Sequence, residues 1–125
     1  VAIDARQETD GWQVYSKGGR VRTEKELFSW AEEAAARGAG EILFTSMDND
    51  GTHKGFANEA TAEIGRRLSI PVIASGGAGS PDDFYRAFTL GGADAALAAG
   101  VFHYGQLTIP EVKEYLAGKG IEVRL

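Results

Sequence analysis

Hydrophobic residues gather in four short runs along this chain, separated by longer stretches with helical spacing. The runs occupy residues 1–3, 42–46, 71–74 and 93–99, and polar residues do not alternate with apolar ones inside them. Such strands are typical of parallel sheets and are buried on both faces. Between the runs, apolar residues recur every three or four positions, as on the buried side of an amphipathic helix. The pattern therefore predicts repeated strand and helix units.

Start and stop signals place the helices between these runs. Thr23-Glu24-Lys25-Glu26 has the sequence of a capping box, and the helix that it predicts ends at Gly38. A second helix is expected around Ala60 to Leu68, and a third from Pro81 to Leu90. A last helix is expected after a capping box at Thr108 to Glu111.

The number and order of these units indicate the fold. Four strand and helix units make about half of a (β/α)8 barrel, whose usual length is roughly 250 residues. We therefore predict one domain over residues 1–125, with the α/β fold of a half-barrel. An open, four-stranded flavodoxin-like sheet is the alternative. Lys17-Gly18-Gly19, between two short strand-like segments, predicts a β-hairpin in the first loop. Because Val1 already lies inside a strand, we expect a fragment or an engineered truncation.

Composition argues against several classes of function. The net charge is −5, and the aromatic residues are not interspersed with lysine or arginine, which argues against a nucleic-acid surface. No apolar stretch is long enough to cross a bilayer. The absence of cysteine excludes thiolate chemistry and fits a cytoplasmic protein. The only histidines are His53 and His103, so we expect no metal and no other cofactor, and we assign neither histidine a role.

The most informative segment lies where the third strand runs into paired glycines and a helix start: Ile73-Ala74-Ser75-Gly76-Gly77-Ala78-Gly79-Ser80-Pro81. Glycine lets the backbone approach an anion closely, and a helix start adds free N–H groups and the positive end of a dipole. Ser80 is the expected N-cap, with Asp83 three residues later. We interpret this segment as a phosphate-binding turn; a tight turn that needs glycine for its geometry alone is the alternative.

Other polar residues follow the remaining strands. In either fold, functional groups gather at the carboxyl ends of parallel strands. Asp4 is expected to end the first strand, and residues 45–50, 75–77 and 99–100 follow the other three. Residues 100–103 predict a short helical turn, of the kind that completes phosphate sites in barrels. The aspartates have an alternative role in forming turns.

Taken together, these segments resemble the cyclase subunit of imidazole glycerol phosphate synthase over essentially the whole chain. The matching motifs are Val1 to Arg6, Gly38 to Leu43, Thr45 to Thr52 and Ala74 to Gly79. The tail from Ala93 to His103 favours this subunit over the related histidine-pathway sugar isomerase, which shares the Asp-Gly-Thr and Ser-Gly-Gly elements. The resemblance implies the carboxyl-terminal half of a (β/α)8 barrel, strands five to eight, without the other half.

The resemblance also implies an enzyme, a lyase and cyclase of histidine biosynthesis. With ammonia it converts a formimino-linked bisphosphorylated ribulosyl aminoimidazole carboxamide ribotide to imidazole glycerol phosphate and aminoimidazole carboxamide ribotide. Asp4 would be one of two aspartates that share general acid and base duty, the other ending strand one of the missing half. One substrate phosphate and its sugar would contact Thr45, Asp50, Gly51, Ser75, Gly76, Gly77, Ala99 and Gly100. Gly100 stands where serine is expected in many relatives.

The resemblance also implies protein partners. A glutaminase subunit would dock on the amino-terminal face of the barrel, where Glu41 matches a gate residue; a merely solvated glutamate is the alternative. We expect the isolated half to be inactive without the missing half, and the alternative is a non-catalytic phosphate-binding half-barrel that forms a homodimer. Unpaired edges at Val1 to Ala5 and Ala93 to Ala99 are expected to drive association.

Overall fold

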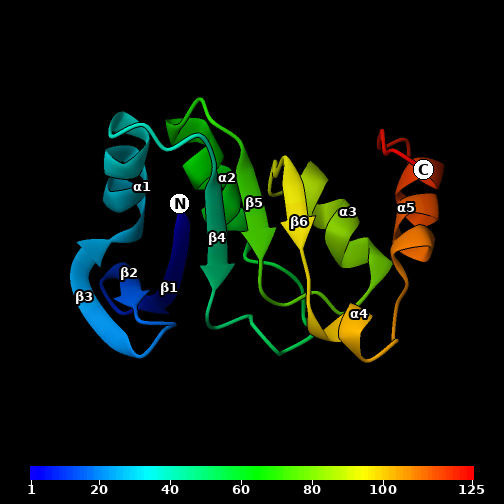
Figure 1. The fold of residues 1–125 in the computed structure, drawn as a ribbon, viewed down its shortest axis with the longest axis horizontal. Helices are drawn as coiled ribbons and strands as arrows, with labels where there is room; N and C mark the ends of the chain where they lie inside the picture. Colours follow the sequence, from blue (N-terminus) through cyan, green and yellow to red (C-terminus); the bar gives the residue numbers. More distant parts are fainter.

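The computed structural model describes residues 1–125 as a single twisted sheet with helices packed against it (Figure 1). The strand order is β3-β2-β1-β4-β5-β6. The strands are β1 (Ala2–Glu8), β2 (Gly11–Ser16), β3 (Val21–Glu26), β4 (Ile42–Ser46), β5 (Val72–Ser75) and β6 (Ala95–Leu97). Strands β1, β4, β5 and β6 are parallel, and β2 and β3 add an antiparallel hairpin beside β1. The parallel strands and their helices have the arrangement of half a (β/α)8 barrel, as predicted.

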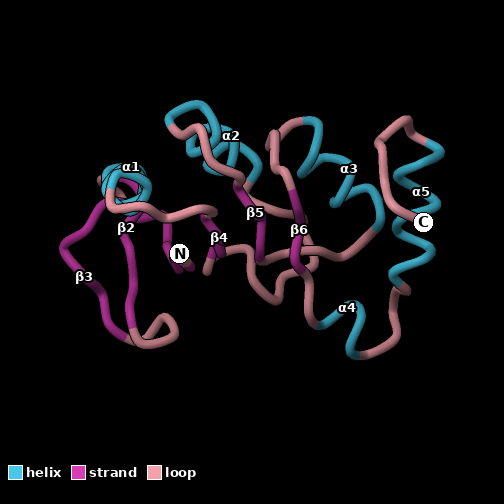
Figure 2. Tube along the Cα trace, turned by 45° about the horizontal axis from the view of Figure 1, so that its top comes forward, coloured by secondary structure: helices cyan, strands magenta, loops and turns pink.

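Helices follow the parallel strands along the chain. They are α1 (Leu27–Ala36), α2 (Asn58–Arg67), α3 (Pro81–Thr89), α4 (Gly100–His103) and α5 (Ile109–Gly118). Figure 2 shows α1, α2 and α3 on the same side of the sheet. Their apolar sides pack on every second residue of the strands, and Ile3, Ile42 and Phe44 are there at most 1% exposed. This side of the sheet forms the core.

The other side of the sheet has no helical cover. Its residues form two rows across the parallel strands, one of Ala2, Leu43, Ile73 and Ala95, and one of Asp4, Thr45, Ser75 and Leu97. Leu43 and Ile73 are half-buried, and Leu97 is 44% exposed. The prediction of strands buried on both faces is therefore wrong for this chain, because only one face is covered. In a closed barrel the same rows would point into the interior. We call this side the open face.

The first strand and the first helix differ from the predictions. Strand β1 continues to Glu8, so Asp4 lies in its middle and does not end it. The predicted capping box at Thr23 is wrong, because β3 runs on to Glu26 and α1 begins at Leu27. The Glu26 carboxylate caps this helix by accepting from the N–H groups of Phe28 and Ser29, at 3.0 and 2.8 Å. The hydroxyl of Thr23 donates instead to the carbonyl of Val14 across the hairpin, at 2.7 Å.

The carboxyl-terminal part follows the predicted order with one shorter strand. Strand β6 covers only Ala95–Leu97, because Ala99 already has helical backbone angles at the start of α4. The predicted helical turn at residues 100–103 is confirmed as α4. The capping box of α5 is confirmed too: the Glu111 carboxylate accepts from the N–H of Thr108 at 2.7 Å, and the Thr108 hydroxyl accepts from the N–H of Glu111 at 3.3 Å.

The hairpin changes the expectation about unpaired edges. Strand β2 pairs with β1 from Asp4 to Glu8, so β1 keeps a free edge only at its first residues. The outer edge of the sheet on this side is β3, whose sequence Val-Arg-Thr-Glu-Lys-Glu is mostly charged and polar. Charged edge strands resist pairing with other chains. At the opposite edge, the unpaired side of β6 stays open, as predicted.

Candidate functional site

A small cavity of about 110 Å³ lies at the carboxyl ends of β4, β5 and β6. All of the predicted phosphate-binding residues except Thr45 line it. The lining consists of Asp50, Gly51, His53, Ser75, Gly76, Gly77, Ala78, Leu97, Ala98, Ala99, Gly100 and Val101. Thr45 borders it, since its Cγ2 lies 3.4 Å from the position of a Cβ on Gly76. The structure thus gathers residues from three separate loops around one cavity.

The glycines after β5 are required by close packing between two loops. Gly76 and Gly77 have φ angles of 92° and 109°, in the left-handed region that favours glycine. A Cβ on Gly76 would lie 2.7 Å from the carbonyl oxygen of Ser46, and one on Gly77 would overlap the carbonyl of Gly55. Gly79 is similarly pressed against the carbonyl of His53. The close approach of the two loops is therefore enough to require glycine at these positions.

The same turn, which lines the cavity, leaves backbone donors without a partner in the chain. The N–H groups of Gly76, Gly77 and Ala78 donate to no acceptor within the chain. Such unpaired N–H groups need a partner, which is water or an anion when no protein acceptor is near. The loop geometry and an anion-binding role are thus compatible in this turn.

The start of α3 is closed by its own capping box. One carboxylate oxygen of Asp83 accepts from the N–H of Gly79 at 2.9 Å and from the N–H of Ser80 at 2.8 Å. It also accepts from the Ser80 hydroxyl at 3.0 Å. These contacts confirm Ser80 as the N-cap with Asp83 as its partner, and they occupy the donors just before the helix. An anion-binding role of the helix start itself stays a prediction.

The start of α4 provides further backbone donors next to the cavity. Gly100 and Val101 form its first turn, where N–H groups have no partner inside the helix, and both line the cavity. The carbonyl of Ala99 accepts from the N–H groups of Phe102 and His103, at 3.1 and 2.8 Å, which fixes the turn. A Cβ on Gly100 would meet no atom within 4 Å. Glycine is therefore not required at residue 100 by packing.

A network of short polar contacts holds the loop after β4. The Ser46 hydroxyl, fully buried, donates to the side-chain oxygen of Asn49 at 2.7 Å. The Asn49 amide donates in turn to the carbonyl of Gly55 at 2.9 Å. The N–H of Asp50 donates to the carbonyl of Ser46 at 3.0 Å. Ser46, one of the candidate residues after the second predicted strand, and Asn49 therefore position Asp50 and Gly51 beside the cavity.

Asp4 lies on the open face but outside the cavity. It pairs with Thr45, which pairs with Ser75, so the three residues form one row across β1, β4 and β5. At about 4.8 Å between neighbouring strands, roughly 10 Å separates Asp4 from Ser75. Asp4 is half-buried and borders a hollow that it shares with Tyr15 and Lys17 of the hairpin. A substrate that reaches from the cavity across the open face would meet its carboxylate.

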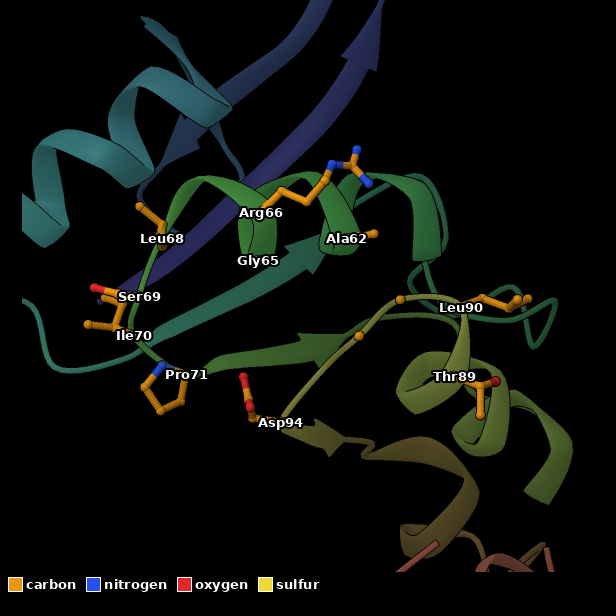
Figure 3. A pocket seen from close by; sticks show the side chains of 12 residues that line it. Ala62, Gly65, Arg66, Leu68, Ser69, Ile70, Pro71, Thr89, Leu90 and Asp94 are labelled. Atoms are coloured by element: carbon orange, nitrogen blue, oxygen red, sulfur yellow. The ribbon is translucent and has the colours of Figure 1, made fainter. Parts of the chain in front are cut away.

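Glu41 lies at the opposite end of the strands. It directly precedes β4, its side chain is exposed, and its carbonyl accepts from the amino terminus of Val1 at 2.8 Å. At this same end, an open hollow of about 510 Å³ lies between α2 and α3 (Figure 3). Asp94 in this hollow accepts from the N–H of Val72 at 2.9 Å and so joins the starts of β5 and β6. The sequence did not indicate this hollow.

Two further structural observations concern metals and membranes. No group of three or more histidine, aspartate and glutamate side chains is arranged to hold a metal ion. None of the helices combines the length and the apolar character needed to pass through a bilayer.

Comparisons with known proteins agree on one family. The model of the family described as "Histidine biosynthesis protein" matches residues 1–108. The imidazole glycerol phosphate synthase subunit HisF of Bacteroides fragilis is 62% identical over 124 residues, which are 99% of this chain and 50% of that protein. The proteins of the same name from Phocaeicola vulgatus and Dehalococcoides mccartyi are each 58% identical over 125 residues, all of this chain and 50% and 49% of theirs. The chain spans about half the length of the curated relatives that it matches.

Proposed function

Because the chain belongs to the histidine biosynthesis protein family, we propose that it is the carboxyl-terminal half of an imidazole glycerol phosphate synthase cyclase subunit. It would supply strands five to eight of a (β/α)8 barrel that acts in the cytoplasm. The parallel strands, the outer helices and the rows of the open face support this placement. The observation that carries the proposal is the cavity, where residues from three loops meet as the family resemblance implies.

The proposed reaction joins ammonia to a formimino-linked, bisphosphorylated ribulosyl aminoimidazole carboxamide ribotide. Its products are imidazole glycerol phosphate, aminoimidazole carboxamide ribotide and the water that the ribulosyl carbonyl oxygen leaves as. Ammonia addition, bond cleavage and ring closure each move protons at nitrogen or oxygen, which a pair of carboxylic groups can relay. Asp4 is the carboxylate of this half, and a second aspartate would come from strand one. The place of Asp4 in the row with Thr45 and Ser75 supports the role of Asp4 as a proton carrier.

The cavity would hold one of the two substrate phosphates. Free N–H groups of Gly76 and Gly77 lie on one side, and the first turn of α4 at Gly100 lies on the other. Backbone donors of this kind bind phosphate oxygens and need no positive side chain. Asp50 and Thr45 would contact the adjoining sugar. The second phosphate would bind in the other half of the barrel.

The proposed partner is a glutaminase that docks at the end of the strands marked by Glu41. Active sites of barrels lie at the carboxyl ends of the strands, so the amino-terminal face is free for a partner that delivers ammonia. Titrating the full-length cyclase with a glutaminase subunit should shift amide signals around Glu41 and leave those of Gly77 unchanged. Shifts confined to the loops at Asp50 and Gly77 would contradict this orientation.

One experiment tests the function itself. The chain is co-expressed with the amino-terminal half of the Bacteroides fragilis subunit, and cyclisation is assayed with ammonium salt and the bisphosphorylated substrate. We expect turnover only when both halves are present. A well-folded complex that lacks turnover but still binds inorganic phosphate at Gly76 and Gly100 would instead favour a phosphate-binding half-barrel without catalysis. Turnover of the substrate of the related sugar isomerase alone would identify the chain as part of that enzyme.

The phosphate-binding half-barrel is kept as a second candidate because of the open face. Leu97 is exposed there, and Leu43 and Ile73 are only half-buried. A second copy of the chain would cover these residues as the missing half would. Such a dimer could bind phosphate in both cavities without the paired aspartates that the cyclase reaction needs.

A further inference from the structure

The loop after β4 is fastened to the end of β1 by the side chain of Asp48. Its carboxylate oxygen Oδ2 accepts a hydrogen bond from the backbone N–H of Gln7 at 2.7 Å. Its other oxygen, Oδ1, lies 3.8 Å from Nε of Arg6. The Arg6 and Asp48 side chains are 48% and 42% exposed, so this ion pair stabilises little, and the bond to Gln7 is the stronger contact.

The bond to Gln7 continues the sheet where β4 has ended. Strand β1 runs on to Glu8, whereas its pairing with β4 stops at Ala5. The N–H of Met47, the first residue after β4, donates to the carbonyl of Ala5 at 2.9 Å, and the chain then leaves the sheet. The Asp48 carboxylate takes the place of the next strand carbonyl. Because it is charged, it binds an N–H group more strongly than a neutral amide oxygen does.

The end of β1 to which Asp48 is tied is itself held by the hairpin. The Arg6 guanidinium lies over the ring of Tyr15, 5.4 Å from its centroid. The Tyr15 hydroxyl donates to the Glu8 carboxylate at 2.8 Å, and Arg22 of β3 forms an ion pair with the same carboxylate at 2.8 Å. This end of β1 is therefore a fixed support for the loop after β4.

The two segments that Asp48 joins carry different parts of the proposed active site. Strand β1 carries Asp4, the proposed proton carrier, on its open face. The loop after β4 carries Asp50 and Gly51, which line the cavity. A displacement of about 1 Å between a bound substrate and its catalytic group can lower a rate about 10²-fold. A contact that fixes the loop relative to β1 is therefore one on which the rate depends.

We propose that Asp48 is a positioning residue of the cyclase reaction, whose bond to the N–H of Gln7 holds the loop at Asp50 in a fixed place relative to Asp4. This inference rests on the proposed function and adds to it a residue whose side chain does not line the cavity. The role needs a hydrogen-bond acceptor and no proton transfer. Asp48→Asn should therefore preserve it, and Asp48→Ala should remove it.

The test uses the barrel formed by this chain and the amino-terminal half, supplied with ammonium salt and the bisphosphorylated substrate. Asp48→Ala should lower kcat about 10²-fold and change KM less than about threefold, because the substrate still binds but is misplaced relative to Asp4. Asp48→Asn should regain most of this loss, since its amide oxygen accepts the same hydrogen bond. Asp10→Ala, in the exposed turn after β1, is the control and should have the kcat of wild type.

A second pair of variants changes the donor of the same hydrogen bond. Gln7→Pro has no backbone N–H and Gln7→Ala keeps it, so the difference between them isolates the bond to Asp48. Gln7→Pro should lower kcat as Asp48→Ala does. The double variant should be no slower than either single one, because both changes remove one interaction. Sulfate should still perturb the amide signals of Gly76 and Gly100 in every variant, which establishes that the fold and the cavity are intact.

Three outcomes would overturn the role of Asp48 and leave the proposed function standing. Turnover of Asp48→Ala at the wild-type rate would show that the loop needs no such contact. Equal losses in Asp48→Asn and Asp48→Ala would show that the carboxylate acts through its charge or its proton. Loss of the sulfate response in Asp48→Ala would show that the substitution disrupts the cavity itself. A wild-type barrel without turnover would instead refute the proposed function, and the role of Asp48 with it.

Discussion

The backbone N–H of Gly55 donates a 2.8 Å hydrogen bond to the carbonyl of Gly77, and the two loops approach so closely that residue 77 has no room for a side chain. This contact joins the loop after β4 to the loop after β5. Both loops line the cavity at the carboxyl ends of the strands. The shape of the candidate site thus depends on one backbone approach that only glycine permits.

Gly77→Ala should therefore destabilise the chain and abolish anion binding. The added Cβ would overlap the carbonyl of Gly55, and the φ of 109° is unfavourable for alanine. Together these effects should lower the free energy of unfolding by about 2 to 4 kcal/mol in urea titrations. Gly118→Ala is the control, because residue 118 lies in α5 with open space around it and alanine favours a helix. Equal stability of Gly77→Ala and wild type would contradict the packing argument.

Gly100→Ser should have the opposite effect on binding. A Cβ at residue 100 meets no atom within 4 Å, so the substitution fits without strain. Its hydroxyl would stand at the start of α4, beside the cavity, and add one donor to a bound anion. We expect sulfate affinity to rise about three- to tenfold, which isothermal titration would measure. Gly100→Ala should leave the affinity near that of wild type, and a matching gain there would show that the hydroxyl is not responsible.

The order of strands and helices followed from local patterns, but several boundaries did not. The sequence placed the first helix cap at Thr23, yet the hairpin uses that hydroxyl for a contact with Val14. This pairing joins residues nine positions apart on different strands, and local capping signals do not report it. The same hairpin extends β1 to Glu8 and so moves Asp4 from a strand end to mid-strand.

In the candidate site too, local sequence signals predicted some features but not the contacts between residues that are distant in the sequence. The glycine turn and the start of α4 were predictable, because each is a local signal after a strand. Two other features depend on how the loops fold together. They are the close approach of Gly77 to Gly55 and the hydrogen bonds from the donors before α3 to Asp83. His53 lines the cavity although the sequence assigned it no role, since its only local signal is its residue type in a polar loop.

Asp4→Asn should stop cyclisation in the full barrel and leave substrate binding largely intact. The amide has nearly the shape of the carboxylate but cannot transfer the proton. Loss of a positioned acid or base typically lowers the rate about 10²- to 10⁴-fold. Steady-state assays of kcat and KM measure both effects, with Asp10→Asn in the exposed turn after β1 as the control. Near-normal turnover by Asp4→Asn would remove Asp4 from the mechanism.

The hairpin should weaken as the pH falls, because of Glu8. The Arg22 guanidinium, 2.8 Å away, and then the Tyr15 hydroxyl, also at 2.8 Å, hold the pKa of the Glu8 carboxyl below its usual value. A carboxyl whose pKa is lower in the folded state stabilises the protein above its unfolded pKa, and this contribution is lost as the pH falls through the lowered value. Glu8→Gln should therefore reduce stability to urea at about pH 7 and converge with wild type at about pH 2.

The control for that prediction is Glu114→Gln on α5, since Glu114 is exposed and forms no ion pair. Its stability should follow that of wild type at every pH. A constant difference between Glu8→Gln and wild type down to the lowest pH would mean that the charge of Glu8 does not stabilise the hairpin.

The isolated chain should associate through its open face and the edge of β6. Leu97 lies on that face at this edge and is 44% exposed, and the unpaired side of β6 offers free backbone groups. An uncovered apolar face beside an open edge drives association with a second copy or with the missing half. Leu97→Lys places a charge on the same spot and should shift the chain toward monomer. Sedimentation velocity at micromolar concentration compares the two, with Val21→Lys on the charged edge strand β3 as the control.

Adding the amino-terminal half should convert the wild type to a one-to-one complex. A wild-type chain that sediments as a cooperatively folded monomer would instead show that the open face is stable in water and would favour an open sheet over a half-barrel.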